Sequence, residues 1–177
     1  MLEYKETKIR PLSMDDLDNI MTWVNDPEVV HRYAYFTKPF TREEEATWLE
    51  NKIKSKVDLF YAIENETGSY LGNVAIEQIH WPSKHGCLSI TIGKKNERNK
   101  GHGNRAVNLL LDHAFNEHKL HKIYLYVAVD NHIGIHVYKK CGFIEEGNLR
   151  DHYVIDGNFV NMYFMSILEE EFREMHQ

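Results

Sequence analysis

The chain has few cysteines and no paired cysteine motif. Cys87 and Cys141 are the 2 cysteines among 177 residues, and they stand far apart in the sequence. This spacing does not provide a disulfide framework or the paired thiols of a structural zinc site. The N-terminus does not read as a secretory leader. We therefore expect both thiols to be reduced and the protein to be cytoplasmic.

Long hydrophobic runs and an excess of positive charge are also missing. No apolar run approaches the roughly 20 residues that a membrane-spanning helix needs. The formal net charge is −6, and the sequence has no clustered basic segment of the kind that binds nucleic acid. We therefore expect neither a membrane nor a nucleic acid as partner, and the acidic balance favours a cationic ligand.

The 11 histidines raise the question of a metal site. None of them belongs to a His-Glu-x-x-His motif, and His113, His118 and His121 lack cysteine or carboxylate neighbours in a recognisable ligand pattern. We interpret them as surface histidines and predict no metal.

The composition is that of a globular protein, with 42% hydrophobic and 27% charged residues. We expect one domain over residues 1–177. Alternating and apolar segments predict strands over residues 8–12, 59–64, 70–79, 87–94, 122–129, 143–146 and 159–168. Helices are predicted over residues 14–24, 41–54 and 133–140, and after residue 102. This order of elements indicates an α/β fold with a mixed sheet covered by helices.

Two helix starts and one helix face are specified locally. Ser13 with Asp16, and Thr41 with the glutamates that follow it, have the spacing of N-terminal caps. The helix after residue 102 should pack one apolar stripe against the sheet, formed by Val107, Leu110, Leu111, Ala114 and Phe115.

The most distinctive motif reads Arg-Asn-Lys-Gly-His-Gly-Asn and lies between a predicted strand and a predicted helix. Glycines allow a tight turn, and the first N–H groups of a helix attract anions. Such a turn can also simply join a strand to a helix. As an anion site it would use Arg98, Asn99, Lys100, Gly101, His102, Gly103 and Asn104.

Arg98, Gly101 and Gly103 match the Arg/Gln-x-x-Gly-x-Gly/Ala pyrophosphate loop of the GCN5-related N-acetyltransferases (GNATs). Downstream, Asn131, Tyr138 and the Gly-Phe pair at residues 142–143 resemble the Asn-x-x-Ala-x-x-x-Tyr-x-x-x-Gly-Phe signature of that family. Gly134 replaces its alanine, which would loosen the first helical turn. The resemblance extends over residues 7–168, and its subgroup includes ribosomal-protein alanine, spermidine and nucleotide-amino-sugar acetyltransferases.

The resemblance implies a GNAT fold: a mostly antiparallel sheet of six to seven strands with a splayed parallel pair, flanked by about four helices. It also implies acetyl-CoA as cosubstrate, with the pantetheine arm paired along residues 89–92. The residues that it assigns to the cofactor, besides those of the glycine motif, are Ile90, Thr91, Ile92, Asn131 and Lys140. Asn131 could equally cap its helix, and both roles can hold together.

In the family, the tyrosine at the position of Tyr138 lies near the thiol sulfur and protonates it, or at least forms a hydrogen bond with it, as coenzyme A leaves. A helix tyrosine that packs through its ring is the alternative. The general base that deprotonates the acceptor amine is less well defined. Glu77 and His80 are the nearest candidates. Cys87 stands where many members of the family have an acidic residue. Glu77 could instead be a solvent-facing strand residue, since alternation alone does not choose its face. We interpret Cys87 as a small buried residue rather than a covalent nucleophile.

An acceptor site is expected between the first two helices. Tyr33, Tyr35 and Phe36 either form a wall of it or pack internally, and His80 is assigned to the acceptor as well.

The predicted function is acetyl transfer from acetyl-CoA to a primary amine of a small molecule, a nucleotide-linked amino sugar or a polyamine, directly in a ternary complex. Alternatives are N-terminal acetylation of a ribosomal protein, and a non-catalytic acyl-CoA-binding regulatory module on the same fold. The subgroup also makes a homodimer an expectation.

Overall fold

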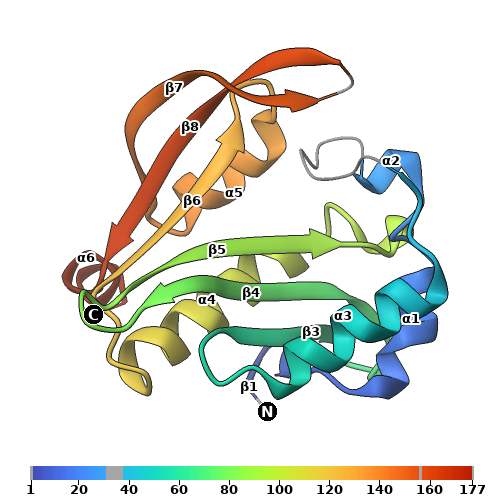
Figure 1. Cartoon of the computed structure of the whole chain (residues 1–177). Coiled ribbons are helices and arrows are strands. Elements are labelled where there is room, and N and C mark those ends of the chain that lie inside the picture. Colours follow the sequence, from blue (N-terminus) through green and yellow to red (C-terminus); the bar gives the residue numbers. More distant parts are fainter. Residues whose placement is uncertain (1, 31–37, 156, 177) are drawn as a thin grey trace.

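A computed structural model describes residues 2–30, 38–155 and 157–176. In this part of the chain eight strands form one sheet, in the order β1-β2-β3-β4-β5-β6-β8-β7 (Figure 1). Neighbouring strands are antiparallel except for β5 and β6, which are parallel. The strands are β1 (Leu2–Tyr4), β2 (Thr7–Pro11), β3 (Leu59–Asn65), β4 (Tyr70–His80), β5 (His85–Ile92), β6 (Lys122–Ala128), β7 (Ile144–Ile155) and β8 (Asn158–Leu168).

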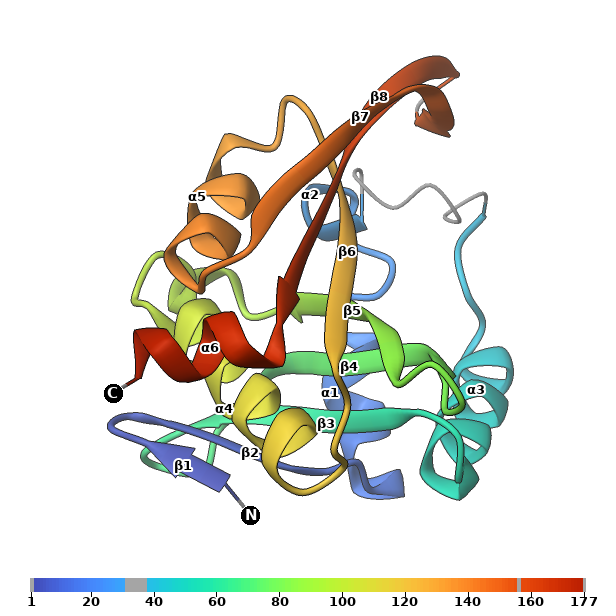
Figure 2. The same ribbon diagram turned by 90° about the vertical axis from the view of Figure 1, so that its left-hand side faces the viewer.

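Helices cover both faces of the sheet. Figure 2 shows α3 and α4 on opposite sides of it. The α-helices are α1 (Leu17–Met21), α2 (Pro27–Val30), α3 (Arg42–Lys54), α4 (His102–Asn116), α5 (His132–Lys140) and α6 (Glu169–Met175). The predicted α/β class and the single parallel pair are confirmed, with one strand and two helices more than expected in the described residues.

The predicted helix starts are confirmed. Ser13 and Asp16 form a capping box, as do Thr41 and Glu44 at the start of α3. The first predicted helix is shorter than expected, because it starts as a 3₁₀ turn over Met14–Asp16 and α1 ends at Met21.

Two hydrophobic cores lie on the two faces of the sheet. The stripe predicted for α4 is completely buried and packs on the sheet together with α6. The smaller core joins α1, α2 and α3 to the opposite face and includes Trp23, Leu49, Ala62 and Tyr70. These cores fix which side chains of each strand face α4 and which face α3.

The parallel strands β5 and β6 pair over three residues only, from His85 with Lys122 to Cys87 with Tyr124. Beyond Cys87 the strands diverge, as Figure 1 shows, and β6 continues in full pairing with β8. The splay predicted from the family resemblance is therefore present, and residues 88–92 of β5 border the opening.

Glu45 on α3 is 5% exposed, and burial raises the pKa of its carboxyl to about 6. As the pH rises from about 4.5, this carboxyl ionises in the unfolded chain before it ionises in the folded protein. The free energy of unfolding therefore falls as the pH rises, until the carboxyl also ionises in the folded protein above about pH 6. Glu45→Gln should therefore raise the free energy of unfolding at pH 7 by about 2 kcal/mol, with no gain near pH 4. Thermal unfolding at the two pH values measures this.

Glu50→Gln on the exposed face of the same helix is the matched control, since Glu50 pairs with Lys54 near solvent. Equal responses of the two variants at pH 7, or a gain for Glu45→Gln that persists near pH 4, would contradict the prediction.

Candidate active site

The glycine motif forms the start of α4. Gly101 is the N-terminal cap of this helix and has a left-handed backbone with φ +83°, and Asn99 is also left-handed with φ +61°. No side chain caps the helix, so its first N–H groups are open to a ligand. A Cβ at Gly101 would lie 2.9 Å from a guanidinium nitrogen of Arg105. The left-handed backbone and the nearby guanidinium favour glycine here, and the geometry of the turn fits an anion.

An open groove of about 480 Å³ lies between this end of α4 and helix α5. Asn99, Gly101 and Asn104 line it from the α4 side, and Lys140 lines it from α5. These four residues were predicted to bind the cofactor. The groove also uses residues of α5 that sequence reasoning missed, namely His132, Ile133, His136 and Val137.

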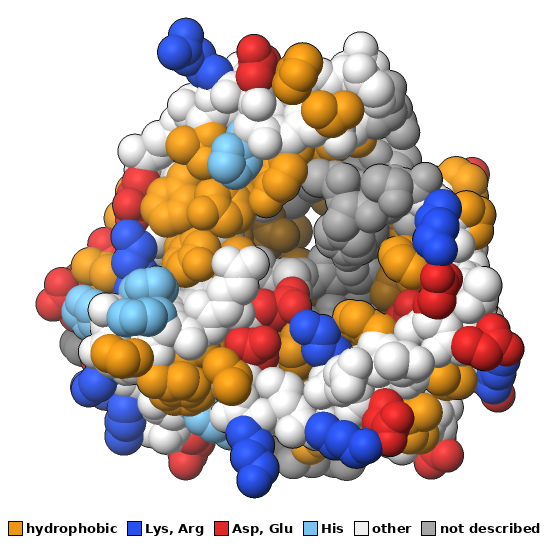
Figure 3. Space-filling model, viewed as in Figure 1, with side chains coloured by type: hydrophobic (Ala, Val, Ile, Leu, Met, Phe, Trp, Pro, Cys, Tyr) orange, Lys and Arg blue, Asp and Glu red, His pale blue; other side chains and the backbone are white. Residues whose placement is uncertain are grey.

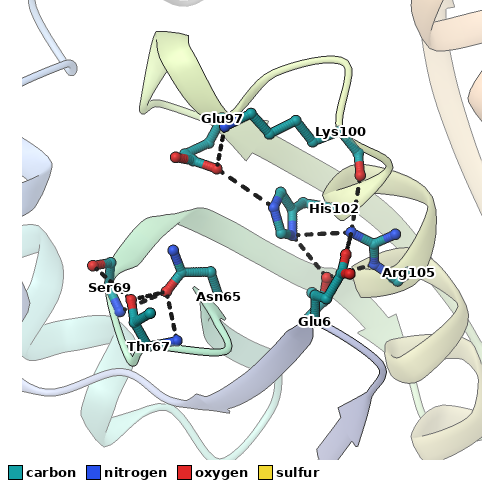
Figure 4. Close-up of polar contacts among 9 residues, drawn as sticks. Glu6, Asn65, Thr67, Ser69, Glu97, Lys100, His102 and Arg105 are labelled. Carbon is teal, nitrogen blue, oxygen red and sulfur yellow. Dashed lines mark hydrogen bonds and ion pairs between the residues drawn. The ribbon is translucent and has the colours of Figure 1, made fainter.

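The side chain of His102 does not line this groove; it is 4% exposed and lies between Glu97 and Arg105 (Figure 4). Its Nδ1 lies 2.8 Å from Thr7 Oγ1, and its Nε2 lies 3.6 Å from a carboxylate oxygen of Glu97. Arg105 donates to Thr7 Oγ1 and to the Lys100 carbonyl. Burial and the Arg105 charge lower the pKa of His102. The side chain of His102 therefore supports the glycine turn from the side of Thr7. Only the backbone of His102 is available to the anion site.

The cations of the motif also have internal partners. Arg98 donates from Nε to the Ile92 carbonyl at 3.0 Å and from an η nitrogen to the Glu28 carbonyl at 3.4 Å. Lys100 lies 3.2 Å from a carboxylate oxygen of Glu97. Arg98 thus holds the end of β5 against the glycine turn, a structural role beside the predicted one.

Asn131 caps α5, since its side chain accepts a hydrogen bond from the Gly134 amide at 3.1 Å. A Cβ at Gly134 would lie 2.8 Å from the Asn131 side-chain nitrogen, so glycine leaves room for this cap. Asn104 donates to the Cys141 sulfur at 3.0 Å and joins α4 to the end of α5. Burial raises the pKa of the Cys141 thiol to about 12.

Glu77 lies on the sheet face that α3 covers, because its neighbour Ile76 belongs to the core on the α4 side. Its two carboxylate oxygens have separate partners: Lys52 on α3 donates to one at 3.2 Å, and Ser89 on β5 donates to the other at 3.0 Å. Cys87 is the cross-strand partner of Glu77. Burial and the Glu77 charge raise the pKa of the Cys87 thiol to about 12, which disfavours a thiolate nucleophile.

Aromatic side chains continue this face across β6 and β8. A groove of about 270 Å³ is lined by His85, Lys122, Tyr124, Tyr126 and Phe164. Figure 3 shows hydrophobic side chains gathered over these strands, with histidines beside them and charged groups nearer the middle of the face. Burial raises the pKa values of Tyr124 and Tyr126.

Tyr138 lies on α5, half-buried against the core on the α4 side. Its ring meets Phe143 edge-on, with centroids 5.9 Å apart. The ring therefore packs against Phe143, and the role of the hydroxyl as an acid stays a prediction.

The remaining predicted acceptor residues fall into two groups. His80 is exposed near the β4–β5 turn, where its Nδ1 accepts from the Ser83 amide and its ring stacks on His85. The structure thus places it beyond Glu77, toward the closed end of the β5–β6 pair. Tyr33, Tyr35 and Phe36 lie outside the described residues.

Over residues 2–30, 38–155 and 157–176, no helix has both the length and the apolar character to cross a membrane. The same residues contain no group of three or more metal-binding side chains of His, Cys, Asp or Glu.

Residues 7–144 match the family model described as an acetyltransferase (GNAT) domain. The chain belongs to the GNAT acetyltransferase family. A spermidine N(1)-acetyltransferase of Vibrio cholerae is 30% identical over 165 residues, which cover 93% of this chain and 94% of the relative. The corresponding enzyme of Escherichia coli K12 is 30% identical over 171 residues, covering 96% of this chain and 90% of the relative.

The fold comparison agrees with the sequence comparison. A crystal structure of spermidine N-acetyltransferase from Vibrio cholerae in complex with CoA and spermine superposes with a TM-score of 0.87 at 27% identity, covering 95% of this chain and 98% of the other. The predicted GNAT fold and N-acetyltransferase activity are therefore confirmed. GNAT acetyltransferases use acetyl-CoA, and the uncapped α4 start with its glycine turn fits a diphosphate.

Proposed function

We propose that this chain acetylates a primary amine of a polyamine, with direct transfer from acetyl-CoA in a ternary complex. The observation that carries the proposal is the divergence of β5 from β6 after Cys87, with the uncapped end of α4 at the wide end of the opening. The spermidine N-acetyltransferases among the relatives support a polyamine as acceptor, and so does the net charge of −6.

The cofactor residues divide between the two ends of the opening. The N–H groups of α4, with Asn99, Asn104 and Lys140 around the groove, would hold the diphosphate end. The backbone of β5 over residues 89–92 would pair with the pantetheine arm and orient the carbonyl. When bound, acetyl-CoA supplies the acetyl thioester that the amine attacks.

Two side chains would handle protons, one on each face of the sheet. Glu77, on the α3 face, accepts the proton that the acceptor ammonium must lose before its nitrogen can attack. Tyr138, on the α4 face, donates a proton to the sulfur as the thiolate leaves. In this proposal the base and the acid come from opposite faces of the sheet.

An acceptor panel tests the function. The purified chain is incubated with acetyl-CoA and one of spermidine, spermine, a nucleotide-linked amino sugar or a basic N-terminal peptide, and free thiol is measured. We expect spermidine and spermine to give a kcat/KM at least about 10-fold above the other acceptors.

Turnover confined to the amino sugar or to the peptide would replace the polyamine by that acceptor class. Tight binding of acetyl-CoA without turnover on any member would favour a non-catalytic acyl-CoA-binding module instead.

A further inference from the structure

Ser89 lies at the opening between β5 and β6, and the mechanism proposed above gives no role to its hydroxyl group. It is the exposed residue of β5, two positions beyond Cys87, where pairing with β6 has ended. Its cross-strand partner on β4 is Ala75, which has only a methyl group to cover it. An acceptor amine that reaches the thioester along this face therefore meets the Ser89 hydroxyl.

The carboxylate of Glu77 is less accessible than this hydroxyl. One of its oxygens accepts from Ser89 and the other from Lys52, and 34% of its side chain is exposed. The Lys52 ammonium has a second contact besides Glu77, because it lies 4.3 Å from the centroid of the Phe60 ring. Three groups from α3, β4 and β5 thus form one ordered chain that ends at the opening.

We infer that Ser89 takes the proton of the acceptor amine and passes one to Glu77, while Lys52 positions the carboxylate; this inference rests on the proposed function. One N–H bond of the acceptor ammonium breaks as Ser89 Oγ gains that proton. At the same time the original Ser89 O–H bond breaks, and its proton joins the Glu77 oxygen that accepted the hydrogen bond. The amine is left neutral, the hydroxyl is restored and the carboxylate becomes a carboxylic acid.

Lys52 supplies the positive charge next to Glu77. The other titratable groups on this face of the packed strands are Cys87 on β5 and Tyr124 and Tyr126 on β6. Burial keeps the pKa values of the thiol and the two phenols raised, so they stay neutral near pH 7.

The test compares Ser89→Ala and Ser89→Thr for kcat/KM with spermidine, between about pH 6 and about pH 9. We expect Ser89→Ala to lower kcat/KM about 10-fold or more, and Ser89→Thr, which keeps a hydroxyl, to stay within about threefold of the parent protein. Ser83→Ala, in the exposed β4–β5 turn, is the matched control and should change nothing. Thermal unfolding should be unaltered in all three variants, because both serines are exposed.

Lys52→Gln is the second test and reads out kcat and KM separately. Without the ammonium, one oxygen of the Glu77 carboxylate loses its charged partner, so kcat should fall by about threefold or more while the KM for acetyl-CoA stays within about threefold of the parent value. Lys54→Gln, on the exposed side of the same helix, is the control and should leave kcat and KM unchanged.

The outcomes separate this inference from the proposed function. Full activity in Ser89→Ala, or equal losses in Ser89→Ala and Ser89→Thr, overturns the relay while acetyl transfer itself stands. An unchanged kcat in Lys52→Gln overturns the role of Lys52. If the parent protein acetylates no acceptor of the panel, the proposed function fails, and the relay fails with it.

Discussion

Glu77→Gln is expected to lower kcat/KM for spermidine at pH 7 by about 100-fold or more. Near neutral pH a primary aliphatic amine is almost entirely protonated, so transfer depends on a group that removes its proton. The glutamine amide is close to the carboxylate in size and can still contact Ser89 and Lys52, but it does not accept the proton. Initial rates of thiol release over a range of spermidine concentrations measure the effect.

The loss should shrink as the pH rises. Above about pH 9 an increasing share of the acceptor is already neutral, and the base becomes less necessary. The exposed variant Glu50→Gln is the control and should behave as the parent protein does. A loss below about threefold at pH 7, or one that is equally large at pH 7 and at high pH, would remove Glu77 from the role of base.

The alternation of residues along β4 did not predict which face of the sheet carries the Glu77 side chain. The sequence predicted β4 within one residue of its observed end, over residues 70–79 against Tyr70–His80. It did not tell which of two faces receives the carboxylate, since both faces of this sheet are covered by helices. Packing of α4 decides this, because its buried stripe draws Val74 and Ile76 to its side and leaves Glu77 opposite Lys52.

The C-terminal hairpin was the least predictable part of the sheet. Only residues 143–146 were expected as a strand before the closing one, whereas β7 extends over Ile144–Ile155. Register shifts near Gly147 and between Leu149 and Tyr153 interrupt the two-residue alternation on which the prediction depended. The strand is also largely exposed, so its sequence has no continuous buried face.

Within the glycine motif, the sequence predicted the turn correctly but not the directions of its side chains. A helix that starts at His102 places this residue on the same side as Ala106, which is buried against the sheet. The helical period could therefore have assigned His102 to the interior. Its partner Thr7 could not be predicted in this way, because the contact with β2 joins residues 95 positions apart.

The surface around Glu77 was predicted only in part, for a related reason. Ser89, Lys52 and Tyr126 come from a strand, a helix and a second strand, and none belongs to a motif with fixed spacing. Their shared surface arises from the order β4-β5-β6 and from the helix that covers it. The glycine motif and Tyr138, by contrast, lie within one stretch of about 40 residues and could be found from local spacing.

Tyr138→Phe should lower kcat by about 100-fold and leave the KM for acetyl-CoA within about threefold of the parent value. The ring packs edge-on against Phe143 and is half-buried, and phenylalanine keeps these contacts. The substitution removes only the hydroxyl, so the proposed acid is lost while the packing that supports binding is kept. Steady-state measurement of thiol release at saturating spermidine separates kcat from KM.

Tyr4→Phe, on the exposed strand β1, is the matched control and should retain full activity. A leaving-group series sharpens the test, because a thiol that is more acidic than that of coenzyme A needs less help to depart. With an acetyl thioester of such a thiol, the difference between Tyr138→Phe and the parent protein should become smaller. If kcat changes by less than about threefold, or if the loss is the same for every leaving group, Tyr138 serves packing alone and the thiolate leaves without an acid from α5.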